Sequence, residues 1–299
     1  MSGKTIPFSE RARSIEGSKT IGITAKAKAM KNDPENREKP VLIFAAGEPD
    51  FDTPDNVKRK AIEAINTGQN KYTPASGVPA LRGAVAKQAS ALYGKSLSPE
   101  NVVITNGAKE GISLIASALL DQGDEVIIPS PYWVSYPDIM SFYGGTPVFV
   151  ETDDNFKLTA SALAGAVTEK TKMVILNSPN NPSGAIIDEA ELRKIGDLAV
   201  EKGMFVLSDE VYRNFVYGGR SHFSMMDLDE DVTRQVLYVD GIAKSYSATG
   251  WRCGQIVGAE EIIKKISQIK SHLSGNAPTP VSYTHLRAHE TVLDLVCRL

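Results

Sequence analysis

The chain has 299 residues, of which 42% are hydrophobic and 23% charged, an ordinary globular composition with enough apolar material for a large core. The formal net charge of −3 gives no sign of a basic surface for nucleic acid, and no apolar run approaches the ~20 residues that span a membrane. The N-terminus lacks a secretory signal, and the two cysteines are far apart, so we expect a reduced, cytoplasmic setting.

The first 45 residues are predicted to form an N-terminal arm rather than part of a core. They are mostly polar, with a predicted helix over residues 18–30 and a turn-rich patch at 31–40. A short apolar run then ends in the segment G-E-P-D-F-D-T-P, which begins at Gly47. Gly, Pro and Asp favour turns for backbone reasons, so this segment by itself indicates only a turn.

Two helices are predicted next, at residues 56–66 and 79–93. Between them lies the segment K-Y-T-P-A-S-G, which contains Tyr72. A tyrosine before a proline-containing loop is more often a packing residue than a functional one.

From residue 102 the sequence alternates strands, loops and helices. Several candidate strands are apolar on successive residues, as expected for strands that helices cover on both faces. Helical patterns lie between most of them, which favours a mostly parallel α/β sheet. We therefore predict a three-layer α/β/α domain around seven strands, at residues 102–105, 125–129, 147–151, 173–176, 205–208, 236–239 and 255–258.

The segment after the sixth predicted strand carries the first chemical signal. Lys244 lies just past the strand end, and Arg252 follows eight residues later among glycines and small residues. A lone lysine in a loop is usually a solvated charge. However, a lysine that loses its proton can form a Schiff base with an aldehyde, and an arginine can grip a phosphate bidentately. An aldehyde and a phosphate together describe pyridoxal 5'-phosphate (PLP).

Two other strand ends offer parts of a PLP site. In T-N-G-A-K, Gly107 would let the backbone approach an anion at a helix N-terminus, although many such glycines only form turns. In S-P-Y-W, Trp133 offers a stacking face, although a tryptophan is more often a core residue. The sequence contains neither a P-loop nor a G-x-G-x-x-G motif, so nucleotide binding loses support.

Two further strands end in polar motifs. Asp209 follows an apolar strand in S-D-E-V-Y, where a carboxylate is costly to bury unless it is paired; the alternative is a helix N-cap. Tyr212 follows three residues later. Asn181 lies in N-S-P-N-N-P-S-G, which by itself is only a turn-rich loop after a strand.

Six of these motifs, in the same order, resemble the class I and II aminotransferases, which are fold-type I PLP enzymes, and within them the bacterial aspartate aminotransferase subgroup. The resemblance covers residues 10–281. It implies transamination between an amino acid, expected to be aspartate, and 2-oxoglutarate, in a homodimer with shared active sites. A related PLP-dependent lyase or decarboxylase, or a truncated inactive PLP-fold product, remain the alternatives.

The resemblance also implies a role for each site residue. Lys244 would be the Schiff-base lysine and proton shuttle, while Asp209 would hold the pyridine nitrogen of PLP. The remaining cofactor contacts would come from Asn181 and Tyr212 at the phenolate oxygen, Arg252, Gly107 and Ala108 at the phosphate, Trp133 on the ring, and Tyr72 toward the partner subunit's cofactor; the substrate would contact Gly47, Lys109, Trp133 and Asn181.

The end of the sequence departs from this resemblance. Residues 282–299 match no family motif, and His285 and His289 lack a third metal ligand, so we expect a non-native tail and no metal. We divide the chain into an arm and part of a small domain (1–45), a PLP-binding large domain (46–281) and this tail.

Without the carboxylate-binding arginine of a C-terminal small domain, we expect the chain as written to transaminate poorly. We also expect it to expose apolar residues after Ala259, such as Ile262, Ile263 and Ile266.

Overall fold

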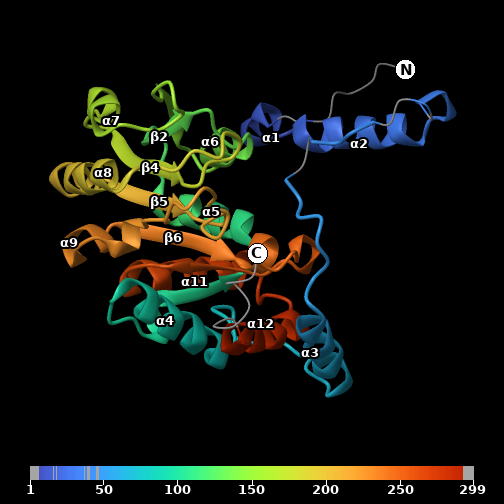
Figure 1. Ribbon diagram of the computed structural model, residues 1–299. Coiled ribbons are helices and arrows are strands. Elements are labelled where there is room, and N and C mark those ends of the chain that lie inside the picture. Colours follow the sequence, from blue (N-terminus) through green and yellow to red (C-terminus); the bar gives the residue numbers. More distant parts are fainter. Residues whose placement is uncertain are drawn as a thin grey trace.

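The computed structural model describes residues 7–15, 17, 19–36, 38, 41–44 and 47–291. A single seven-stranded sheet organises the body of the molecule, with the strand order β1-β7-β6-β5-β4-β2-β3 (Figure 1). All seven predicted strands are confirmed, each within two residues of its expected bounds. The strands are β1 (Val102–Thr105), β2 (Glu125–Ser130), β3 (Thr146–Glu151), β4 (Thr171–Asn177), β5 (Phe205–Asp209), β6 (Val236–Gly241) and β7 (Gly254–Val257).

The sheet is mostly parallel, as predicted, with one reversed strand. The pairs from β3 through β2, β4 and β5 to β6 are all parallel. Strand β7 runs antiparallel to both of its neighbours, β6 and β1. All four of its residues are buried, so its composition carries no sign of its direction. The connection between β6 and β7 contains only the short helices α10 (Ile242–Ser245) and η4 (Thr249–Trp251), whereas a parallel crossover usually contains a full-length helix.

Helices cover both faces of the sheet, which confirms the three-layer α/β/α architecture (Figure 1). Each face buries its own apolar cluster. One cluster includes residues of α4 (Pro79–Tyr93), α7 (Ala160–Ala166), α8 (Glu189–Lys202) and α9 (Glu230–Thr233). The other includes residues of α5 (Ala108–Leu119), α6 (Ser135–Phe142) and α11 (Glu260–Leu273).

The expectation that the segment after Ala259 would expose its apolar residues is wrong. Ile263 is 1% exposed and Ile266 is fully buried, while Ile262 is partly buried against the same cluster. These residues lie on the inner face of α11, which packs on α5 and β1. The helix therefore finds its packing partner within the large domain itself.

The N-terminal segment extends from the body (Figure 1). Helix α1 (Glu10–Ser14) contacts α6, whereas α2 (Lys19–Asn32) projects outward and is followed by the short turn η1 (Pro34–Asn36). The described residues 41–44 and 47–54, which form neither helix nor strand, precede α3 (Asp55–Asn66).

The C-terminal helix α12 (Thr279–Thr291) packs against α3 and α4. The part of residues 282–299 that the structure describes, up to residue 291, belongs to this helix; the rest lies outside the described residues. The division at residues 45 and 281 stays a prediction. Within the described parts of the chain, no helix combines the length and the apolar character needed to cross a bilayer.

Candidate active site

The carboxyl ends of β4, β5 and β6 lie side by side and carry the polar motifs. Asn177, the last residue of β4, pairs with Asp209, the last residue of β5. Its side-chain Nδ2 donates to the Asp209 carbonyl oxygen over 2.9 Å, and its Oδ1 accepts from the Asn181 amide over 2.7 Å. Asn177 therefore links two parts of the site: the loop that contains Asn181 and the strand that ends at Asp209. Sequence reasoning did not assign Asn177 a role, although it begins the N-S-P-N-N-P-S-G motif.

Asp209 is a buried carboxyl, 4% exposed, at the centre of this edge of the sheet. Its Oδ2 accepts a hydrogen bond of 2.7 Å from the hydroxyl of Tyr136 in α6, and burial raises the pKa of Asp209 to about 6. The N-cap alternative is wrong, because turns rather than a helix follow β5. Among the described residues, the hydrogen bonds to this carboxylate come from neutral groups, Tyr136 and the Val211 amide, so a cationic partner would stabilise it.

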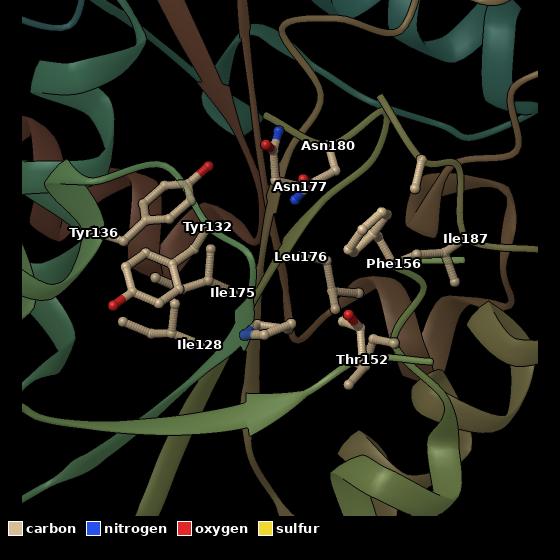
Figure 2. Close-up of a pocket in the computed structure, with 13 residues that line it drawn as sticks. Ile128, Tyr132, Tyr136, Thr152, Phe156, Ile175, Leu176, Asn177, Asn180 and Ile187 are labelled. Carbon is tan, nitrogen blue, oxygen red and sulfur yellow. The ribbon is translucent and has the colours of Figure 1, made fainter. Parts of the chain in front are cut away.

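Tyr136 and Asn177 also line a cavity beneath this edge of the sheet (Figure 2). Its other walls are mainly apolar, from residues such as Leu176 and Ile187. Tyr136 was missed from the sequence because nothing local separates it from a core tyrosine; its hydroxyl meets Asp209 only in the folded sheet. Burial raises the pKa of Tyr136, and the neighbouring Asp209 raises it further, so the phenol stays a proton donor to the carboxylate.

Lys244 lies in the short helix α10 (Ile242–Ser245), directly after β6. Its Nζ donates a hydrogen bond to the carbonyl oxygen of Gly47 and lies 5.5 Å from the centre of the Tyr212 ring. Two segments that are distant in the sequence, at Gly47 and at Tyr212, therefore meet at the lysine amine.

The electrostatic surroundings favour loss of a proton from Lys244. Burial lowers its pKa, and the negative charges of Glu48 and Asp209 only partly offset this effect. The positive charge of Arg252 lowers the pKa further. A neutral lysine amine is both a nucleophile and a base.

Tyr212 and Asn181 lie near each other at this site. Burial and the charge of Asp209 raise the pKa of the Tyr212 phenol, and the neighbouring Asn181 side chain only partly offsets this effect. A Cβ atom at Gly47 would lie 3.5 Å from the Tyr212 oxygen, so the backbone at Gly47 borders the same space. The structure thus brings together Lys244, Asp209, Asn181, Tyr212 and Gly47; their roles stay a prediction.

Arg252 and Gly107 form a close-packed turn at the start of α5. Arg252 Nη2 donates to the Asn106 carbonyl over 3.1 Å, and Nη1 donates to the Thr249 carbonyl over 3.0 Å. Gly107 is the N-cap of α5 with a φ of 86°, and a Cβ there would lie 2.5 Å from Arg252 Nη2. Only glycine satisfies both the positive φ and this approach. The first amides of α5, beginning at Ala108, lie at a helix N-terminus beside a guanidinium.

Trp133 and Lys109 lie next to each other. The Lys109 ammonium lies 4.8 Å from the Trp133 ring centre and 3.4 Å from the Ser135 hydroxyl oxygen. Burial and the charge of Arg252 lower the pKa of Lys109. The Trp133 ring meets Tyr136 edge to face, with centroids 5.2 Å apart. Lys109 and Trp133 are therefore linked through Tyr136 to Asp209. Tyr72 is not part of this group, because it is 98% exposed in the loop after α3.

These groups fit PLP. The lysine amine suits the aldehyde, and the buried Asp209 lacks a cationic partner among the described residues, a need that a protonated pyridine nitrogen would meet. The turn at Gly107, which a Cβ would fill, offers free helix amides and the Arg252 guanidinium to a phosphate. A metal has no comparable site: the described residues include no group of three or more His, Cys, Asp or Glu side chains suitably placed.

Comparison with known proteins places this geometry in context. A family model described as aminotransferase class I and II matches residues 39–294. The aspartate aminotransferase of Bacillus sp. (strain YM-2) is 39% identical over 291 residues, which is 97% of this chain and 73% of the relative. The asparagine–oxo-acid transaminase of Streptococcus mutans is 38% identical over 284 residues, covering 94% and 71%. The solved aspartate aminotransferase of Thermus thermophilus with maleate superposes with a TM-score of 0.91 at 36% identity, covering 98% of this chain and 75% of that one.

Proposed function

The chain belongs to the class I and II aminotransferase family, whose members use PLP, and from this premise we propose that it transfers the amino group of aspartate to 2-oxoglutarate. The observation that carries the proposal is the convergence of Lys244, Gly47 and Tyr212. Together with Asp209 and the turn of Gly107 and Arg252, they form a site that suits the aldehyde, the pyridine nitrogen and the phosphate of PLP.

The proposed mechanism assigns a task to each group. When bound, PLP supplies an aldehyde that holds the amino group and a protonated ring that withdraws electrons. Lys244 Nζ accepts the proton from the substrate Cα and returns it during the transfer, a task that its lowered pKa supports. Asp209 keeps the ring nitrogen protonated, and Tyr136 orients its carboxylate.

The other predicted residues bind and orient. We propose that Asn181 and Tyr212 hold the phenolate oxygen, and that Trp133 covers one face of the ring. Arg252 and the α5 amides at Gly107 and Ala108 bind the phosphate. The substrate lies along Gly47, Lys109, Trp133 and Asn181.

We also propose that the protein is a cytoplasmic homodimer. Tyr72 is 98% exposed, and Leu42 and Phe44 of the N-terminal segment are 75% and 89% exposed. An apolar, extended segment of this kind is suited to cover a second copy of the chain. Tyr72 would then serve the partner subunit's cofactor.

A coupled assay tests the activity. Purified protein supplied with PLP, aspartate and 2-oxoglutarate should form oxaloacetate and glutamate in equal amounts. Aspartate alone should convert the bound cofactor to its amine form. Release of carbon dioxide or ammonia without that conversion would favour the decarboxylase or lyase alternative. No conversion at all would contradict the proposal and favour the alternative of an inactive PLP-fold product.

The choice of donor depends on Lys109. Relatives of nearly equal identity are described as aspartate and as asparagine–oxo-acid transaminases, so the family alone does not set the donor. The Thermus thermophilus structure contains maleate, a dicarboxylate. Lys109 lies over Trp133, and its ammonium is suited to bind a second carboxylate.

We expect Lys109→Ala to raise the KM for aspartate about tenfold, because a hydrogen bond to a charged group contributes ~1.5–3 kcal/mol. The KM for an aromatic donor should change by less than about twofold, since that donor has no second carboxylate. Steady-state kinetics with both donors measure the difference. Lys265→Ala, which removes an exposed lysine from α11, is the control. Equal effects on both donors would show that Lys109 is only a solvated helix lysine.

A further inference from the structure

A buried lysine outside the proposed site lies on α11. Lys270 is fully buried, and its Nζ lies 3.6 Å from Glu110 Oε2 and 3.3 Å from Ser274 Oγ and donates to the Gly275 carbonyl. Lysine is almost never fully buried unless it is paired. The partner that matters here is Glu110, which lies in the first turn of α5.

Glu110 folds back onto the residue before the glycine turn. Its Oε2 accepts the Asn106 amide over 2.5 Å, and its Oε1 accepts the Asn106 side-chain Nδ2 over 2.9 Å. The carbonyl of the same Asn106 accepts Arg252 Nη2 over 3.1 Å. A continuous series of contacts therefore runs from Lys270 through Glu110 and Asn106 to Arg252.

This use of a carboxylate creates an electrostatic conflict. A negative charge stabilises a helix N-terminus, but the same charge repels an anion that binds there. The Glu110 side chain is only 17% exposed, so water screens this repulsion weakly. A cation on the far side of Glu110 would cancel the repulsion and leave its hydrogen bonds intact.

We propose that Lys270 is a positioning residue for the cofactor phosphate: it neutralises the Glu110 carboxylate, which holds Asn106, so that the α5 N-terminus accepts the phosphate. The inference rests on the proposed function, because it takes PLP as the ligand of this turn. It adds two residues that do not touch the cofactor.

The test compares two ligands that differ only in the phosphate. Apoprotein is titrated with PLP and with pyridoxal, and binding is followed by absorbance. Lys270→Gln should weaken PLP binding about tenfold, which corresponds to ~1.4 kcal/mol, while pyridoxal binding stays within about twofold. The double variant Lys270→Gln/Glu110→Gln, which is neutral at this point, should recover most of the PLP affinity.

Controls separate this effect from loss of folding. Lys265→Gln removes an exposed charge from the same helix and should change neither affinity. Glu110→Gln removes the carboxylate and keeps the cation, so it should not lower PLP affinity relative to pyridoxal, and it carries the test if Lys270→Gln does not fold. Equal losses for both ligands in Lys270→Gln, or a selective loss of PLP binding in Glu110→Gln, would overturn the proposal. Wild-type protein that binds neither ligand would instead refute the proposed function.

Discussion

Replacing Lys244 with alanine is expected to reduce amino transfer by ~10⁴-fold, the upper end of the effect of a positioned acid–base group. The variant loses both the amine that bonds to the cofactor aldehyde and the base that moves the Cα proton. Among the described residues, Lys109 is the other lysine of the proposed site, but its ammonium lies over the Trp133 ring. We therefore expect no other side chain to replace Lys244.

Chemical labelling checks the assignment independently of activity. Borohydride reduction of the PLP-loaded protein, followed by peptide mapping, should place the cofactor on Lys244. Lys265→Ala should label and turn over like wild type, since Lys265 lies exposed on α11. A label on another lysine, or a Lys244→Ala variant that keeps activity within about tenfold of wild type, would contradict the assignment.

The fold was predictable where the sequence signal was local. Runs such as 173–176 and 236–239 are apolar on successive residues because helices cover both faces of β4 and β6, and both strands were located correctly. The direction of β7 was not predictable, because a strand buried along its whole length looks the same in either direction. The burial of Ile263 was misjudged because its packing partners, α5 and β1, lie some 150 residues away in the sequence.

The candidate site also contains some residues that the sequence predicted and others that only the structure revealed. Lys244, Arg252 and Gly107 stand in short motifs that are chemically distinctive in the sequence. Tyr136 and Lys270 were missed, because their roles depend on contacts with Asp209 and Glu110 that only the folded chain creates. A motif therefore predicted the groups that would touch the cofactor, and the structure was needed for the groups that hold them in place.

A second ion pair lies at the end of β6, just before the helix that carries Lys244. Asp240, four residues before the lysine, is 4% exposed, and its Oδ2 accepts from Arg213 Nε and from the Tyr238 hydroxyl, each over 2.9 Å. Its Oδ1 accepts the Gly241 amide over 2.7 Å. The carboxylate thus holds together the end of β6 and the segment after β5.

Arg213→Met is expected to lower the free energy of unfolding by ~3–5 kcal/mol, because it leaves the charge of Asp240 buried without its cation. Urea denaturation of the apoprotein measures the change. Arg193→Met is the matched control: it breaks an exposed pair with Glu189 on α8 and should cost only ~0.3–0.5 kcal/mol.

The double variant Arg213→Met/Asp240→Asn identifies the cause. If the cost comes from an uncompensated buried charge, the neutral asparagine should recover more than half of the lost stability, since it can still accept from Tyr238. If the cost comes from lost packing of the arginine side chain, the double variant should be no more stable than Arg213→Met. A small effect of Arg213→Met, similar to that of Arg193→Met, would show that the Asp240 pair contributes no more than a surface contact.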